Sequence, residues 1–365
     1  MPGGCAAPSG RATCAGTSVC GVVELLILLA PSANRVYASE APRLVAAEIQ
    51  AMATGFGIPL DSVEPVQVAG VDYLSLRLPG DAGAADDVVR VVSVVSAAHA
   101  IFAREGELLR PVPLRRPERY PSDLVTIQKY PGKTNEQLTR LLLNVTAAAT
   151  DHPQRLLAGS LQVLDPMCGR GTTLNVALTY GLDVTGVDVD KRDFEEYERF
   201  VKTWLRQHRY KHTADTGQLR THGRVRGRRL DVTVAPTKEA FKAGEVQRLT
   251  YLGTDTTDLD GLLKGGQFDV VVTDTPYGVE HGSHGDRIAR NPLQLLDVAL
   301  PGWLRVLRRG GALGLTYNRH VAPPEELVEL FARHGLEPVG DPMADTYRHR
   351  VDASIDRDLI VARRA

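Results

Sequence analysis

The chain has 365 residues, of which 43% are hydrophobic, and a formal net charge of −1 at pH 7. This length allows two domains with buried cores. The near-zero net charge excludes a general electrostatic attraction to nucleic acid, so any affinity for phosphate must come from a local basic surface. The cysteines show neither the paired spacing of a zinc site nor the density of a disulfide framework, which predicts no metal site and a reducing, cytoplasmic environment; they are Cys5, Cys14, Cys20 and Cys168.

The amino-terminal residues 1–21 are rich in Gly, Ala, Ser and Cys and are expected to form a disordered extension. The apolar run that follows, 22–30, imitates the core of a signal peptide. It is short and contains Glu24, which favours a strand of a folded domain. No stretch reaches the roughly 18 apolar residues of a transmembrane helix, so no membrane partner is expected.

Residues 22–110 are expected to form a small domain in which strand and helix patterns follow one another in a βαββαβ order. It contains no catalytic constellation, which favours a packing or substrate-positioning module. The predicted elements after the first strand are a helix at 42–54, strands at 65–68 and 72–78, a helix at 85–95 and a strand at 97–102. Prolines alternate with arginines in 111–124, which predicts a stiff, basic linker and a domain boundary.

The second predicted domain, 125–365, opens with a helix whose Leu138, Leu141 and Leu142 lie on one face. Thr134 and Gln137 are expected to form a capping box at its start. Apolar strand patterns then alternate with helical patterns, which predicts a parallel sheet with a binding crevice at the carboxyl ends of its strands. The expected core strands are 161–165, 184–188, 249–254, 268–274 and 312–317.

Four of these strands end in, or just before, an aspartate: Asp165, Asp188, Asp255 and Asp274. One such carboxylate could cap a helix or lie in solvent, but four in order along one crevice favour a binding site. Tyr317-Asn318-Arg319 leave the fifth strand on the same side, where either a substrate contact or a structural role is possible.

The segment 165–173 reads Asp-Pro-Met-Cys-Gly-Arg-Gly-Thr-Thr and lies between a strand and a helix. Such a turn lets the backbone approach a bound nucleotide. It lacks the third glycine of dinucleotide-binding folds, and Gly169, Gly171 and Thr172 are its candidate cofactor-binding residues. If the ligand is S-adenosylmethionine, Asp165 would hold the loop or the ammonium group, Asp188 or else Asp190 the ribose hydroxyls, and Asp255 the adenine amine.

The segment Asp274-Thr275-Pro276-Tyr277-Gly278 ends another apolar strand. An exocyclic amine of guanine or adenine is a poor nucleophile, because its lone pair is delocalised into the ring. Asp274 and a backbone carbonyl fixed by Pro276 could accept its two N–H bonds, while Tyr277 could stack on the base. Alone, the segment is good turn chemistry. Together with the glycine turn, it indicates methyl transfer to a nucleobase amine.

These motifs resemble those of the class I S-adenosylmethionine-dependent methyltransferases, and among them the tRNA guanine-N2 methyltransferase group. The resemblance covers 125–365 and rests on the segments 129–135, 165–172, 186–190 and 274–278. It implies a Rossmann-like α/β sheet with an antiparallel last strand pair, a ferredoxin-like lead domain, S-adenosylmethionine as cofactor, and RNA, in particular tRNA, as partner. Asp274, Pro276 and Tyr277 would then hold the base, and the other aspartates the cofactor.

Two features depart from that pattern. Thr275 stands where the family has a proline, which is expected to loosen the turn. The segment 192–248 is about twice as long as a connection there requires; its part 202–229 contains nine Lys or Arg against one acid, Asp215. This basic insertion could bind an RNA backbone, or it could be a solvated, partly disordered loop.

The predicted function is methylation of the N2 amine of a guanosine in tRNA. Two alternatives remain open. An adenine-N6 or cytosine-N4 methyltransferase acting on DNA or RNA would use the same carboxylate, but on duplex DNA it must flip the base and commonly carries a large target-recognition domain, for which no segment is long enough. A non-catalytic protein that binds S-adenosylmethionine or RNA is the other alternative; the acids at every strand end argue against it.

Overall fold

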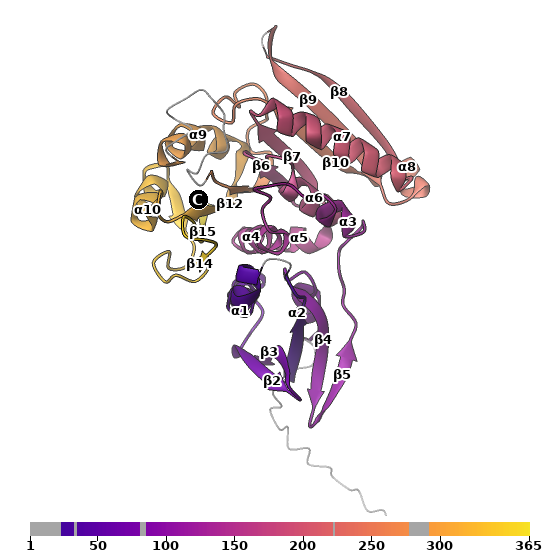
Figure 1. Cartoon of the computed structure of the whole chain (residues 1–365), viewed down its shortest axis with the longest axis vertical. Coiled ribbons are helices and arrows are strands. Elements are labelled where there is room, and N and C mark those ends of the chain that lie inside the picture. The colour runs from indigo at the N-terminus through magenta and orange to yellow at the C-terminus, as the bar shows by residue number, and fades with distance from the viewer. Residues whose placement is uncertain (1–22, 33–34, 81–84, 222, 277–291) are drawn as a thin grey trace, which may run out of the picture.

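The computed structural model describes residues 23–32, 35–80, 85–221, 223–276 and 292–365. The expected disordered extension therefore lies outside the described residues. The amino-terminal part is an antiparallel sheet with two helices (Figure 1). Its elements are β1 Val23–Leu29, α1 Arg35–Phe56, β2 Ser62–Val68, β3 Val71–Leu78, α2 Ala85–Ser93, β4 Ala98–Glu105 and β5 Leu108–Val112.

The strand order of this lead sheet is β2-β3-β1-β4-β5. Its first four strands have the ferredoxin-like arrangement, with the apolar run that imitates a signal peptide as the central strand β1. Leu25 and Ile27 of β1 are buried in one cluster with Val45 and Ile49 of α1. The fifth strand, β5, was not predicted. It lies at the sheet edge, where the N–H that Pro111 lacks is not needed for pairing, and it occupies the start of the expected linker.

The remaining described residues form a second part of the chain around a 10-stranded sheet. The strand order of this sheet is β13-β15-β12-β11-β6-β7-β10-β9-β8, and β14 pairs with β15. Its elements are α3 Asp123–Thr126, α4 Glu136–Ala148, α5 Gln154–Ala158, β6 Gln162–Asp165, α6 Thr172–Thr179, β7 Asp183–Asp188, α7 Lys191–Gln207, β8 Lys211–Thr221, β9 Arg224–Ala235, α8 Lys238–Ala243, β10 Gln247–Gly253, β11 Phe268–Asp274, α9 Pro292–Val306, β12 Leu307–Asn318, α10 Pro324–Arg333, β13 Leu336–Pro338, β14 His349–Arg350 and β15 Asp356–Arg364.

The centre of the second sheet is parallel, and β15 runs antiparallel to both β12 and β13. This is the predicted Rossmann-like sheet with an antiparallel last strand pair. Apolar strands such as β11, in which Val270, Val271 and Val272 are all fully buried, are covered on both faces, as parallel strands require. Val270 and Val272 pack in a cluster with α4, α6 and α7, whereas Val271 packs with α9 and α10.

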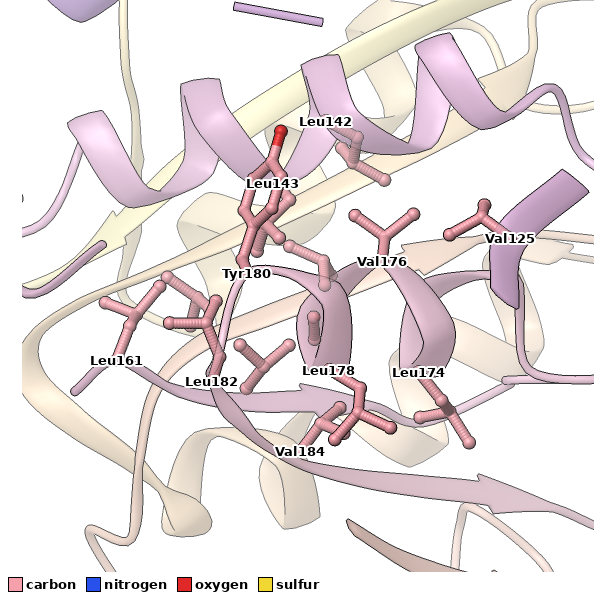
Figure 2. Packing of buried hydrophobic residues seen from close by; sticks show 14 of the residues in the cluster. Val125, Leu142, Leu143, Leu161, Leu174, Val176, Leu178, Tyr180, Leu182 and Val184 are labelled. Carbon is pink, nitrogen blue, oxygen red and sulfur yellow. The ribbon is translucent and has the colours of Figure 1, made fainter. Parts of the chain in front are cut away.

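Helix α6 follows directly after the glycine turn, and it packs against α4 on one side and against the sheet on the other. Figure 2 shows Leu174, Val176 and Leu178 of α6 between α4 and the strands, in one cluster with Leu142 and Val184. Burial of a large aliphatic side chain stabilises the fold by roughly 1.5–3 kcal/mol. The amino-terminal end of α6 is therefore held rigidly at the carboxyl edge of the sheet.

The segment 192–248 is folded in the residues that the structure describes, 192–221 and 223–248, so the expectation that its part 202–229 is a partly disordered loop is wrong for them. It forms α7, the β8–β9 hairpin and α8, and β9 pairs antiparallel with β10. The physical reason lies in β9, where Leu230, Val232 and Val234 are buried and alternate with more exposed residues. This period of two is typical of a strand with one covered face.

The lead sheet joins the second part of the chain through α1, which packs against α4. Glu48 of α1 is fully buried at this junction. Its carboxylate accepts hydrogen bonds from the backbone N–H of Ser96 at 2.9 Å and from Nδ2 of Asn144 at 2.7 Å. Burial nevertheless raises the pKa of Glu48 to about 7.

This shift predicts a pH dependence of stability. The folded-state pKa of Glu48 exceeds its ordinary value of 4.5, so its stabilising contribution is complete below about pH 4.5 and is lost as the pH rises through about 7. The loss amounts to about 3 kcal/mol at most. We expect Glu48→Gln, which stays neutral, to gain stability relative to the wild type between pH 5 and pH 8 in urea unfolding. A difference between the two proteins that does not change with pH would contradict this assignment.

Candidate functional site

The carboxyl ends of four neighbouring strands bring the predicted aspartates to one edge of the second sheet. Asp274, Asp165 and Asp188 are the last residues of β11, β6 and β7, and Asp255 follows the end of β10. These strands are adjacent in the order β11-β6-β7-β10. Asp188 lies level with Gly253 of β10 in the parallel register. As predicted, the four acids lie along one edge of the sheet.

Asp165 contacts its own loop and the neighbouring strand. One of its carboxylate oxygens accepts hydrogen bonds from the backbone N–H of Met167 at 3.1 Å and from Oγ1 of Thr273 at 3.0 Å. The side chain is only 3% exposed, and burial raises its pKa to about 7. Of the two roles considered for Asp165, these contacts support the one of holding the loop.

The glycine turn needs its glycines for two separate reasons. Gly169 and Gly171 have φ angles of 47° and 78°, in the left-handed region that favours glycine. A Cβ atom on Gly171 would also lie 2.3 Å from Cε2 of Tyr197. The turn is tied to the next strand, because the backbone N–H of Gly169 donates to Oδ2 of Asp188 at 2.8 Å.

The two candidate ribose acids have different surroundings. Asp188 accepts from Gly169 through Oδ2 and from the backbone N–H of Asp190 through Oδ1, at 2.9 Å, which leaves each oxygen one further lone pair. Burial raises the pKa of Asp188. Asp190 is the N-cap of α7 and accepts from the N–H groups of Arg192 and Asp193. Because Asp190 is engaged in capping, Asp188 is the better candidate.

Thr172 is the first residue of α6 and contacts Tyr130, a residue to which the sequence analysis gave no separate role. Its Oγ1 lies 3.3 Å from the hydroxyl of Tyr130. The guanidinium of Arg170 lies 4.8 Å from the centre of the Tyr130 ring and forms an ion pair with Asp193. The segment 129–135 thus packs against the turn, and the resemblance of that segment to the family was the available signal.

Cys168 lies inside the same turn and is buried. A Cβ atom on Gly186 would lie 2.7 Å from its Sγ, so the thiol packs closely against β7. Burial raises the pKa of Cys168 well above its usual value. A protonated thiol in this position is a packing group and a poor nucleophile.

Asp255 is exposed at the end of the crevice beyond β10. Its Oδ1 accepts from both the backbone N–H and the hydroxyl of Thr257, at 2.8 Å and 2.7 Å. These two contacts fix the turn 255–257. Both are made by Oδ1, and neither involves Oδ2. The position is compatible with the expected contact to an adenine amine.

Asp274 is held from both sides by threonine hydroxyls. Thr134 donates to Oδ2 at 2.6 Å, and Thr316, opposite Asp274 in the β11–β12 register, donates to Oδ1. The capping box expected at Thr134 is wrong: Asn135 is the N-cap of α4 and accepts from the N–H groups of Gln137 and Leu138. An Asn directly after the threonine takes the cap, so the Thr134 side chain reaches the carboxylate instead.

Thr275 is also anchored, so the expected loosening is not found at this residue. Its backbone N–H and its hydroxyl both donate to the carbonyl of Thr316, at 3.1 Å and 2.8 Å, and proline could make neither bond. Pro276 is exposed at the crevice. Tyr277 and residues 278–291 lie outside the described residues, and stacking on Tyr277 stays a prediction.

The polar residues at the end of β12 have structural contacts. The hydroxyl of Tyr317 donates to Asp358 at 3.3 Å, Nδ2 of Asn318 donates to the carbonyl of Ser354 at 2.9 Å, and Arg319 forms an ion pair with Asp358. Both Tyr317 and Asn318 are only 1% exposed. These contacts join the end of β12 to β15 and to the residues just before β15, which favours the structural role over a substrate contact.

Within the described ranges, no group of three or more His, Cys, Asp or Glu side chains could hold a metal ion. None of the helices there is long and apolar enough to cross a membrane.

The strand order and the antiparallel β15 define the fold of a class I methyltransferase. Residues 126–311, about half of the chain, match the model of the RMKL-like methyltransferase domain family. The chain belongs to this family. S-adenosylmethionine, the methyl donor of class I methyltransferases, is its cofactor. A comparison with curated proteins gave no match.

Solved structures of other methyltransferases are similar to the chain at low identity. TrmN from Thermus thermophilus is 15% identical, with a TM-score of 0.37, over 83% of this chain and 59% of TrmN. The 1,6-didemethyltoxoflavin-N1-methyltransferase of Burkholderia thailandensis is 17% identical, with a TM-score of 0.37, over 73% of this chain and 96% of that one. The magnesium protoporphyrin IX methyltransferase of Synechocystis PCC 6803 is 15% identical, with a TM-score of 0.35, over 65% and 87%.

Proposed function

We propose that this methyltransferase modifies an exocyclic nucleobase amine in RNA, specifically the N2 amine of a guanosine in tRNA. The observation that carries the proposal is the Asp274 carboxylate, which two threonine hydroxyls hold at the end of β11. The family establishes methyl transfer. The geometry around Asp274 therefore bears on which group of the substrate accepts the methyl.

The residues at the crevice fit the cofactor. Gly169 and Gly171 present backbone without a Cβ at the strand-to-helix turn, the kind of turn against which class I folds place a nucleotide. Asp188 would accept from the ribose hydroxyls and Asp255 from the adenine amine. Bound there, S-adenosylmethionine supplies an electrophilic methyl group on a sulfonium.

The acceptor chemistry follows from the contacts of Asp274. Thr134 donates to one oxygen and Thr316 to the other, which fixes the carboxylate plane, and a carboxylate oriented in this way would accept an N–H of the target amine. The carbonyl before Pro276 would accept the second N–H. As the amine nitrogen attacks, positive charge develops beside these fixed acceptors, and their orientation requires no rearrangement. The buried Cys168 thiol takes no part.

RNA as the substrate is supported by the resemblance of the motifs to the tRNA guanine-N2 group and by a lead sheet with the ferredoxin-like order ahead of the catalytic part. The inserted segment between β7 and β10 is occupied by α7, a hairpin and α8, which is too little for a separate DNA target-recognition domain. A cytoplasmic role in tRNA processing would follow from this substrate.

Tritium transfer from labelled S-adenosylmethionine to bulk tRNA and to duplex DNA tests the proposal. We expect label in tRNA with the wild type and with Asp260→Ala, a control change of an acid that is 87% exposed, pairs with Arg305 and ends none of the four strands. Asp274→Ala should abolish most of it. Label in duplex DNA alone would favour the DNA amino-methyltransferase, and no transfer to either would favour a non-catalytic protein.

A further inference from the structure

The β8–β9 hairpin extends past the edge of the sheet on which the crevice lies. Gly253, the last residue of β10, lies opposite both Asp188 of β7 and Arg228 of β9. Because β9 is antiparallel to β10, its earlier residues, from Arg224, continue beyond the level of the strand-end acids. Four residues of strand span roughly 13 Å. Figure 1 shows the hairpin projecting from the sheet beyond α7.

The part of the hairpin next to the sheet is firmly anchored. Leu219 is 4% exposed and belongs to the same buried cluster as Leu252 and Leu259. A Cβ atom on Gly227 would lie 1.8 Å from the carbonyl oxygen of Gly253, so the two strands approach as closely as glycine permits. The residues at the hairpin tip, from Arg220 and Arg224 outwards, are therefore attached to a firmly held part of the hairpin.

The arginines of the hairpin fall into two groups. Those near its anchored part are neutralised inside the fold: Arg226 by Asp258, Arg228 by Glu195 and Glu198, and Arg229 by Asp231. Arg228 also lies 4.7 Å from the ring centre of Phe194. The number of Lys and Arg residues in this segment is therefore larger than the number of positive charges that remain available to bind a partner.

Arg220 and Arg224 form the second group, and both are exposed near the tip. In the described part of the chain, no ion pair joins either guanidinium to a carboxylate; Arg220 donates to the side-chain carbonyl of Gln218 at 2.6 Å. Both residues lie past the carboxyl-end edge of the sheet, beyond the level of Gly253 and Asp188. Arg220 is opposite Val225 and Arg224 is opposite Thr221 in the hairpin register, so the two side chains emerge on opposite faces of the hairpin tip.

We propose that Arg220 and Arg224 bind backbone phosphates of the RNA substrate a few nucleotides away from the target base. This inference rests on the proposed function. From β11 there are four strand steps to β9, which carries Arg224, and five to β8, which carries Arg220; at about 4.8 Å a step this is roughly 20–24 Å. This separation excludes contact with the base at Asp274 and matches the flanking backbone. Cations without internal partners release counterions from phosphates and supply affinity that is independent of sequence.

The test compares two double variants with the same loss of charge at opposite ends of one hairpin. Arg220→Gln with Arg224→Gln changes the tip. Arg209→Gln with Lys211→Gln is the control with the same loss of charge. Both residues are exposed, Lys211 begins β8 and Arg209 precedes it by two residues, at the other edge of the sheet; Lys211 also contacts the ring of Phe241. Binding of bulk tRNA is measured between 50 and 200 mM salt, and methylation kinetics are measured alongside it.

For the tip variant we expect the KM for tRNA to rise at least roughly ten-fold and the slope of log affinity against log salt to fall by about 1.5, the contribution of two phosphate contacts. The kcat at saturating tRNA and the affinity for S-adenosylmethionine should not change, which also shows that the variant is folded. The control variant should behave as the wild type.

Two results would overturn the inference while leaving the proposed function intact: a tip variant with unchanged tRNA binding and salt slope, or equal losses in the tip and control variants. A wild type that neither binds nor methylates tRNA would refute the proposed function, and this inference with it.

Discussion

Asp274→Ala should lower the kcat for methyl transfer by roughly 10²–10³, by analogy with the loss of one preorganised polar group at other active sites. The carboxylate is held by Thr134 and Thr316, so its position is set before the substrate arrives. The interaction it would make grows as charge develops on the attacking nitrogen. Its removal should therefore affect the transition state more than the bound cofactor, and the affinity for S-adenosylmethionine should stay nearly intact.

Single-turnover kinetics with saturating tRNA would measure this effect. Thr134→Val keeps the carboxylate but removes the threonine donor to Oδ2, and we expect a smaller loss than for Asp274→Ala, because Thr316 still holds the other oxygen. Asp260→Ala is the control for the loss of an acid elsewhere. Full activity of Asp274→Ala would refute the mechanism.

Asp188→Ala should weaken S-adenosylmethionine binding by roughly 10- to 100-fold. Hydrogen bonds to a charged group contribute about 1.5–3 kcal/mol, and about 1.4 kcal/mol corresponds to a factor of ten in affinity. The carboxylate has two functions in this account: it would accept from the ribose, and it holds the N–H of Gly169 in the glycine turn. Both are lost in the alanine variant.

Asp190→Ala separates the two candidate ribose acids. Loss of the α7 N-cap should lower the free energy of unfolding by about 1 kcal/mol with little change in cofactor affinity. Calorimetric titration with S-adenosylmethionine measures both variants. Undiminished binding after Asp188→Ala and after Asp190→Ala would show that the crevice is wrongly assigned.

The sheet and the order of its strand-end acids could be predicted because the signals are local. Each core strand is a short apolar run, and parallel strands align their carboxyl ends at one edge of the sheet. The aspartates that end these runs could therefore be placed at that edge before any contact between the strands was known. The strands expected at 161–165, 184–188 and 268–274 are found as β6 Gln162–Asp165, β7 Asp183–Asp188 and β11 Phe268–Asp274. The ferredoxin-like order also followed from local patterns and from the resemblance of the lead domain.

What could not be predicted depends on contacts between distant residues. The Thr134 hydroxyl reaches Asp274 across 140 positions, and its sequence neighbours suggested a helix cap. In the basic insertion, the partners of Arg226 and Arg228, such as Asp258 and Glu195, lie outside the segment in which the charges were counted. The alternation in β9 was hidden by the arginines that precede it.

The central claim is that the amine held at Asp274 is the N2 amine of a guanosine in tRNA. Mass spectrometry of nucleosides from tRNA treated with the enzyme and S-adenosylmethionine tests it most directly, because the masses and retention times distinguish the methylated bases. The account predicts N2-methylguanosine with the wild type and a large reduction of it with Asp274→Ala. Methyl groups found only on adenine or cytosine would contradict the guanosine assignment.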